Sequence, residues 1–219
     1  EVLAAGHDRL WATGGEIPPG QIHPSRLFAP GEAPTFNPLL AVQVDRSIEP
    51  ITAIGFVGES RAYFRRTQTY VHEGDGPDNS SNGSWTTPRT AYSDVGALGP
   101  EGLALISSGL LFQSPAGIRL LGPGGGLQPI GHPVDAVAQG LSLAGTLVSG
   151  ADQEVRFYAR TGSTLVYNYQ YDIWTTWDVT AAGVARNPDT GLATLANPRG
   201  YLWDETDDVW TDAGRPYNH

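Results

Sequence analysis

The sequence predicts an all-β protein, a β-propeller whose blades are four-stranded antiparallel sheets. The first observation is a repeat in the last quarter of the chain: residues 165–168 and 172–175 recur thirty-six residues later as residues 201–204 and 208–211. Each copy reads as a short apolar strand, an acidic turn and a second strand that contains Trp-Thr. Such a hairpin is too small to bury its own apolar face, so the copies must pack on one another.

A second pair of copies lies upstream, at an offset of forty-eight residues. Residues 60–64 and 70–71 align with residues 108–112 and 118–119. Both pairs of copies share the same order of a strand, a short turn and a strand. Four aromatic residues take one place in this alignment, and we expect them to be buried on inner strands: Phe64, Phe112, Tyr167 and Trp203.

The third observation is the spacing of short apolar runs between Gly, Pro, Asn and Asp. Runs that follow one another at about 8–12 residues are typical of a sandwich, barrel or propeller, and the repeats favour the propeller. A helical pattern is confined to residues 134–141. We expect residues 1–219 to form about five blades or part-blades of one propeller domain or fragment: 1–50, 51–98, 99–141, 142–180 and 181–219. Because the chain opens without Met, we expect it to be part of a larger propeller.

The composition removes several classes of chemistry. The 219 residues contain no Cys, so disulfides, thiolate nucleophiles and cysteine zinc sites are excluded. They also contain no Lys, because all 13 cationic residues are Arg, which excludes a Schiff base and a Walker-type lysine. The Gly-rich run 122–126 is therefore expected to be a loose turn between strands.

The net charge bears on nucleic acid and membranes. A formal charge of −10 argues against gripping nucleic acid, because that affinity comes mainly from Lys and Arg at phosphates. A negative wall would instead let DNA slide past without adhering. No run approaches the roughly 18–20 apolar residues that a membrane-spanning helix needs. We therefore expect neither sequence-specific nucleic-acid binding nor membrane association.

Residues 74–84 form a long polar loop, and three arginines make the only basic group. The loop offers oxygen donors, but its spacing lacks the carboxylate at the twelfth position of an EF-hand, so we expect no metal. It is expected to be a flexible projection that touches a partner subunit, or a plain solvated loop. The arginines indicate either a solvated strand edge or a salt bridge to an acidic neighbour. The residues expected to contact a partner are Asp75, Asp78, Asn79, Asn82, Arg61, Arg65 and Arg66.

Three sets of residues are also candidates for catalysis or ligand binding. Paired carboxylates could hydrolyse glycosides, but the acids occupy equivalent turns of two repeats, where structure alone favours Asp. Tryptophans could form a sugar platform, although in strands they are more often core. Five scattered histidines lack metal-ligand spacing. We therefore predict a protein that is not an enzyme and that has no catalytic, metal or cofactor residues. The acids, tryptophans and histidines to which this prediction applies are Asp172, Asp178, Asp204, Glu205, Asp207, Asp208, Asp212, Trp174, Trp177, Trp203, Trp210, His7, His23, His72, His132 and His219.

Several segments resemble β-propeller proteins of tailed-phage necks and tails, a group that includes packaged-DNA stabilisation proteins and the tail tubular protein B, or nozzle, of short-tailed phages. The segments are 8–11, 25–27, 36–37, 51–54, 70–77, 93–96, 109–118 and 165–167 with Trp174. The resemblance implies a structural virion protein, a ring-forming neck, tail or nozzle component around the DNA exit channel. Its implied partners are portal, adaptor or tail subunits and copies of itself. A glycan-recognising propeller of a tail tip and a propeller glycoside hydrolase remain as alternatives.

Overall fold

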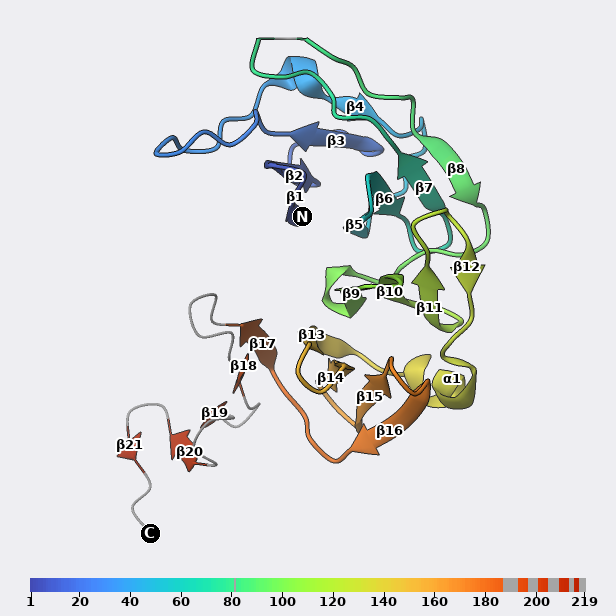
Figure 1. Cartoon of the computed structure of the whole chain (residues 1–219), viewed down its shortest axis with the longest axis vertical. Coiled ribbons are helices and arrows are strands. Elements are labelled where there is room, and N and C mark those ends of the chain that lie inside the picture. The colour runs from blue at the N-terminus through green and yellow to red at the C-terminus, as the bar shows by residue number, and fades with distance from the viewer. Residues whose placement is uncertain (81, 187–192, 197–200, 205–208, 213–214, 217–219) are drawn as a thin grey trace. The chain divides into compact units, whose positions relative to one another are not determined.

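The computed structural model describes residues 1–80, 82–186, 193–196, 201–204, 209–212 and 215–216. Nearly all regular structure in these ranges is antiparallel β-sheet (Figure 1), which confirms the all-β, propeller-like fold class. The helical pattern near residue 134 gives a 3-10 turn, η3 (His132–Val134), and a four-residue helix, α1 (Asp135–Ala138). No helix in the described part of the chain is long and apolar enough to cross a membrane.

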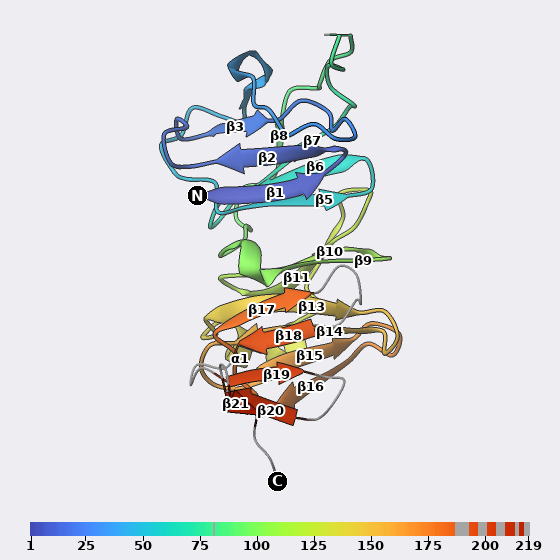
Figure 2. The ribbon, with the colours of Figure 1, turned by 90° about the vertical axis from the view of Figure 1, so that its left-hand side faces the viewer.

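The chain divides into two compact units, Glu1–Ile130 and Gly131–His219. Whether residues 1–219 form one propeller domain stays a prediction. The first unit holds three four-stranded sheets in which each strand pairs with the next along the chain (Figure 2). The first sheet is β1 (Val2–Gly6), β2 (Arg9–Thr13), β3 (Gln21–Pro24) and β4 (Val42–Gln43), with the 3-10 turn η1 (Pro38–Leu40) before β4. The second sheet is β5 (Ala53–Val57), β6 (Ser60–Phe64), β7 (Thr69–His72) and β8 (Arg89–Tyr92). The third is β9 (Leu103–Ile106), β10 (Gly109–Ser114), β11 (Gly117–Leu121) and β12 (Leu127–Gln128), after the turn η2 (Pro100–Gly102).

The second unit holds two more sheets. The fourth sheet is β13 (Leu143–Ser149), β14 (Glu154–Ala159), β15 (Thr164–Asn168) and β16 (Ile173–Trp177). The fifth has one strand more than expected: β17 (Gly183–Arg186), β18 (Ala193–Ala196), β19 (Tyr201–Asp204), β20 (Val209–Asp212) and β21 (Arg215–Pro216).

Both sequence repeats mark equivalent strands. The thirty-six-residue repeat gives the third and fourth strands of the last two sheets, with Tyr167 opposite Trp174 and Trp203 opposite Trp210. The forty-eight-residue repeat gives the second and third strands of the second and third sheets. The expectation that all four aromatic residues share one place is therefore wrong, because Phe64 lies on a second strand and Tyr167 on a third.

The expected burial of the four residues holds where it can be assessed. Phe64 and Phe112 are fully buried, with ring centroids 4.8 Å apart. Tyr167 is buried as well, whereas the side chain of Trp203 lies outside the described residues. Aromatic rings at this separation add attraction to the area that they bury.

Neighbouring sheets meet through their first strands, as propeller blades do. In the first unit β5 contacts β1 and β9, and in the second β13 contacts β17. Three of these strands carry a glycine at the contact. A Cβ on Gly6 would lie 2.6 Å from the ring of Phe56, one on Gly55 would lie 2.3 Å from Leu110, and one on Gly145 would lie 2.9 Å from Val184. Close approach of the neighbouring sheet to each of these strands therefore requires the missing side chain.

The two-residue period of β5 divides its side chains between two cores. Ile54 faces the cluster shared with the first sheet, which also contains Trp11 and Tyr63. Ala53 and Val57 face the cluster shared with the third sheet. The second sheet is thus covered on both faces, and its central strand β6 is buried throughout.

Candidate functional site

The contact between the first and second sheets contains three buried arginines. Arg9 on β2 and Arg65 after β6 are fully buried, and Arg61 on β6 is 2% exposed. Only Arg65 forms an ion pair, with Asp45 of the same chain. Burial alone would raise the pKa of Asp45, but hydrogen bonds from Tyr70 and the backbone and the charge of Arg65 outweigh it and lower that pKa.

Backbone carbonyl groups, and not carboxylates, accept the hydrogen bonds of the other two arginines. Arg9 Nη1 donates to the Ser25 carbonyl at 2.7 Å, and its Nη2 donates to the carbonyl of Pro77. Arg61 Nη1 donates to the Gly74 carbonyl at 2.6 Å. Among the described residues neither guanidinium has a carboxylate within ion-pair distance, and each Nε is buried without a hydrogen bond.

Indole rings cover both guanidinium groups. The Arg61 guanidinium carbon lies 4.9 Å from the ring centroid of Trp11, and that of Arg9 lies 5.4 Å from the ring of Trp85. A desolvated cation over an indole face is attracted by the quadrupole of the ring. Burial lowers the pKa of Arg61, and burial together with the charge of Arg61 lowers the pKa of Arg9.

His72, at the end of β7, lies in the same cluster. Its Nδ1 is 2.7 Å from the hydroxyl of Tyr63, and its ring meets the edge of Trp85 at 5.9 Å between centroids. Burial, and secondly the charge of Arg61, lower the pKa of His72 to about 4, against a smaller opposing effect of the Thr86 backbone. Burial also raises the pKa of Tyr63. The imidazole and the phenol are therefore both neutral at pH 7.

A surface groove of about 320 Å³ lies beside this cluster. It is lined by residues 39–43, which lead into and include β4, and by residues 83–88, together with His72 and Pro77. The lining combines apolar side chains with the imidazole and several hydroxyls. Trp85 and Pro77 belong both to the groove and to the immediate surroundings of Arg9.

Residues 74–84 were expected to be a plain solvated loop or a flexible projection; residues 78–80 and 82–84 are exposed, but Gly74, Pro77 and Asn79 are held to the protein by hydrogen bonds. Arg61 and Arg9 donate to two carbonyls of this segment, and Asn79 exchanges hydrogen bonds of 3.1 and 3.3 Å with the backbone of Leu27. Gly76 has φ 75°, and a Cβ there would fall 1.9 Å from the indole nitrogen of Trp85. We call residues 74–80 the strap, since they tie the second sheet to the first.

The acidic and amide side chains of this segment organise it locally. Asp78 Oδ1 accepts the backbone N–H groups of Ser80 and Asn82, each at 2.8 Å, and these hydrogen bonds lower the pKa of Asp78. Asp75 is exposed. Contact of Asp75, Asp78, Asn79 and Asn82 with a partner stays a prediction.

The prediction that the arginines lie at a solvent-exposed strand edge is wrong for Arg61 and Arg65, which are buried. On β6 and just beyond it, Arg61, Tyr63 and Arg65 alternate with Ala62 and Phe64, so the arginines face the first sheet. An alternating Arg-x-Tyr-x-Arg strand covered on both faces places its cations inside the protein. Arg66 is exposed, and a contact of Arg66 with a partner stays a prediction.

The signal that sequence reasoning missed is the matching pattern on β2. Arg9 and Trp11 alternate there with half-buried residues, as Arg61 and Tyr63 alternate on β6. Two Arg-x-aromatic strands from neighbouring sheets supply both cations and one of the two indole faces.

The acids and tryptophans considered for glycoside chemistry are separate from this cluster. Asp172 sits in the β15–β16 turn at φ 56° and accepts a 3.0 Å hydrogen bond from Tyr167, whose pKa burial and Asp172 raise to about 12. Trp174 stacks on Tyr167 at 4.7 Å, and Arg156 lies 4.7 Å over the ring of Trp177. The remaining acids and tryptophans of that set, apart from the exposed Asp178, lie outside the described side chains: Asp204, Glu205, Asp207, Asp208, Asp212, Trp203 and Trp210.

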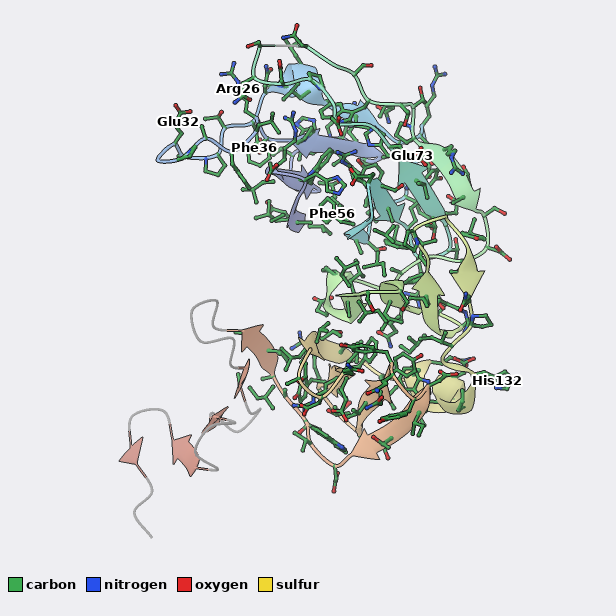
Figure 3. All side chains as sticks on the ribbon, in the orientation of Figure 1. Arg26, Glu32, Phe36, Phe56, Glu73 and His132 are labelled. Atoms are coloured by element: carbon green, nitrogen blue, oxygen red, sulfur yellow. The ribbon has the colours of Figure 1, made fainter. Side chains whose placement is uncertain are left out.

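The described residues contain no group of three or more His, Asp or Glu that could hold a metal ion. His7 contacts the Gly58 carbonyl at 3.1 Å, and His132 is exposed before α1 (Figure 3). His23 lies 3.4 Å from Gln21, and His219 falls outside the described part of the chain.

Comparison with known proteins shows the fold alone. No family model matches the chain, and no curated protein matches its sequence. One similar solved structure is the extracellular domain of the putative one component system BT4673 from B. thetaiotaomicron, with a TM-score of 0.53 and 10% identity. Another is the computationally designed Ika8 protein, with a TM-score of 0.50 and 12% identity.

These two matches cover 94% and 91% of this chain, but the chain spans only 26% and 56% of the two proteins. Identities this low carry no information on ligand or activity. Neither protein comes from a phage, so the resemblance to phage propeller proteins stays a prediction.

Proposed function

We propose that this chain is a structural, non-catalytic module of a tailed-phage particle, a ring-forming neck, tail or nozzle component around the DNA exit channel. The observation that carries the structural role is the use of Arg9 and Arg61 to fasten one sheet to the next. Such contacts would resist relative movement of the first two sheets, which suits a part that must hold its shape under load. The phage setting rests on the sequence resemblance alone.

A hairpin at residues 25–36 is the surface best suited to contact a neighbouring copy in the ring. Ser25 bridges Phe36, and the Arg26 N–H donates to the Thr35 carbonyl at 2.8 Å. Figure 3 shows Glu32 at the tip of this segment, away from the first sheet. Phe28 and Phe36 are 46% and 45% exposed on it. Exposed aromatic side chains on a projection favour protein contacts.

The test is the oligomeric state of a double variant, Phe28→Ser with Phe36→Ser. We expect the wild-type chain, within its parent protein, to form rings in electron micrographs and the variant to remain monomeric by light scattering. Ile48→Ser is the matched control, because Ile48 is also exposed but lies outside the hairpin. Unchanged far-ultraviolet circular dichroism would show that the variants are folded. Rings formed equally well by the double variant would remove the hairpin from the proposal.

The role around DNA has its own test. The chain has a charge of −10, and three of its arginines are buried inside the first unit. It should therefore not retard DNA at about 150 mM salt, where charge is screened beyond roughly 8 Å. Tight binding of DNA under these conditions would contradict a wall past which DNA slides.

Glycan recognition is the second candidate. Tyr171 is exposed, and the next aromatic residue along the chain, Trp174, is only half-buried, so one end of the β15–β16 hairpin offers aromatic surface. A glycan array probed with the wild-type chain and with Tyr171→Ala separates this candidate from the structural role. Binding that depends on Tyr171 would favour it, and an array without signal would remove it.

A further inference from the structure

Arg9 and Arg61 place two positive charges in the interior without a contacting anion. Taking a cation out of water is costly unless an anion or a full set of acceptors replaces the water. Three carbonyls serve the terminal nitrogens, but both Nε groups stay without an acceptor. The charge of Arg61 also acts on Arg9 and on His72. The cluster is therefore rich in donors and has no carboxylate in contact with either guanidinium, although the more distant charges of Asp75 and Glu59 act on Arg61.

The groove is separated from these cations by a single layer of residues. Pro77 lines the groove, and its carbonyl accepts from Arg9. Trp85 lines it too, with the Arg9 guanidinium over its ring. His72, the third wall residue of the cluster, is buried, and its Nε2 makes no hydrogen bond of normal geometry. Only this layer of protein lies between the guanidinium groups and the groove. Charges interact more strongly through protein than through water, so the positive potential of the two arginines reaches the groove.

We propose that this groove binds a small organic ligand that carries an oxyanion, either a carboxylate or a phosphate. The oxyanion lies at the Pro77 end and takes the place of the Pro77 carbonyl as acceptor for Arg9. An anionic acceptor is preferred there, because it adds the attraction of opposite charges in a poorly solvated site to the hydrogen bond that the carbonyl already accepts. The apolar part of the ligand lies against Leu39 and Val42. This inference does not depend on the proposed role in a phage particle.

Two exposed apolar residues give a matched pair of variants. Leu39 lines the groove and is 91% exposed, whereas Ile48 is 90% exposed and does not line it. Leu39→Asp places a negative charge at the groove, and Ile48→Asp adds the same charge elsewhere on the first unit. Neither change disturbs a buried contact, so both variants should fold.

Phenyl phosphate, benzoate and inorganic phosphate are the probes, at equal ionic strength made up with chloride. Isothermal titration calorimetry should show binding to the wild-type chain and to Ile48→Asp with equal affinity. Leu39→Asp should bind roughly three- to tenfold more weakly, as expected for one added charge at short range. Thermal unfolding should shift upward with each probe that binds.

The three probes distinguish the sources of the oxyanion. Binding of phenyl phosphate and inorganic phosphate without benzoate assigns a phosphate ligand, and the reverse assigns a carboxylate. The proposal is overturned if no probe binds at about 10 mM. A site with a Kd of about 1 mM would be largely occupied at that concentration, and the protein would be measurably stabilised. Equal affinity of all three chains would also overturn it, because the binding would then lie outside the groove. Ring formation is measured in a separate experiment, so absence of rings is distinguishable from absence of ligand binding.

Discussion

The second sheet joins its two neighbours by different chemistry on its two faces. Toward the third sheet, β6 presents Ala62 and Phe64, which pack on Phe112 in an apolar cluster. Toward the first sheet, the same strand presents Arg61 and Tyr63, which lie among indole rings, an imidazole and carbonyl groups. One five-residue strand thus serves two interfaces, because its side chains alternate.

The apolar and the cationic interfaces of the second sheet contribute differently to stability and to geometry. Apolar burial supplies free energy roughly in proportion to the area removed from water, and it is indifferent to pH. A buried, hydrogen-bonded cation supplies little net free energy, yet it fixes geometry, because any misplacement leaves a charge without its acceptors. We therefore expect the apolar interface to dominate stability and the cationic interface to carry sensitivity to pH and ligands.

The largest effect should come from the apolar interface. Phe112→Ala removes a fully buried ring that contacts Phe64, so the free energy of unfolding should fall by about 3–5 kcal/mol. Urea unfolding followed by circular dichroism measures the change. Leu105→Ala is the control, because Leu105 lies in the same sheet but is exposed. A loss below about 1 kcal/mol would mean that the second and third sheets do not share this core.

The cationic interface should respond to pH through His72. The unfolded chain takes up this proton near pH 6.5 and the folded chain only near pH 4, so the unfolded state binds more protons in between. Stability should therefore be fully present above pH 6.5 and fall as the pH drops toward 4, by about 2–3 kcal/mol.

The comparison of unfolding free energies between wild type and His72→Gln isolates this contribution from the other groups. The difference between the two should shrink across the same pH window. His132→Gln, at an exposed position, should follow the wild-type curve. Parallel curves for wild type and His72→Gln would contradict the buried, neutral imidazole.

Removing a cation should cost less than removing the ring. Arg61→Met keeps much of the side-chain volume but loses the hydrogen bond to Gly74 and the contact with Trp11. The loss should be about 1–2 kcal/mol, because relief of an uncompensated buried charge offsets part of it. Arg66→Met, on the exposed neighbour, should stay within about 0.5 kcal/mol of wild type. A loss as large as that of Phe112→Ala would erase the distinction between the two interfaces.

The smallest effect should come from the strap. Asn79→Ala removes two exposed hydrogen bonds to Leu27, which should cost about 0.5 kcal/mol. Amide hydrogen exchange of the strap should rise in this variant and stay unchanged in β10 and β11. Exchange that rises equally throughout the first unit would show that the strap is part of one cooperative structure with the apolar core.

The repeats in the sequence predicted the strands that carry apolar side chains at regular offsets. Phe64 and Phe112 came out buried on equivalent strands for that reason. Strand β8 gave no such signal, because Arg89–Tyr92 is polar and pairs through its backbone. The alignment of Phe64 with Tyr167 was wrong. The second and the third strands of each of these sheets are apolar, so their amino-acid composition does not distinguish them.

The candidate site was less accessible to sequence reasoning. Apart from Pro77, the loop at residues 74–84 has no apolar side chain, so nothing in the sequence indicated an anchor. Two of its anchors are carbonyl oxygens, which every residue possesses. The groove brings together residues 39–43, at the fourth strand of the first sheet, and residues 83–88, in the loop before β8 of the second sheet, and these segments share no motif. The alternation around Arg61 and the matching Arg9–Trp11 pattern are the sequence signals that these charges point inward.

The most direct test of the account is a double-mutant cycle between Arg61 and Trp11, whose cation–ring contact joins the second sheet to the first. Unfolding free energies are measured for wild type, Arg61→Met, Trp11→Leu and the double variant at pH 7. We predict a coupling free energy of about 1–2 kcal/mol, the range for a desolvated cation on an indole face. Additive losses, with a coupling near zero, would contradict the claim that a buried cation fastens these two sheets.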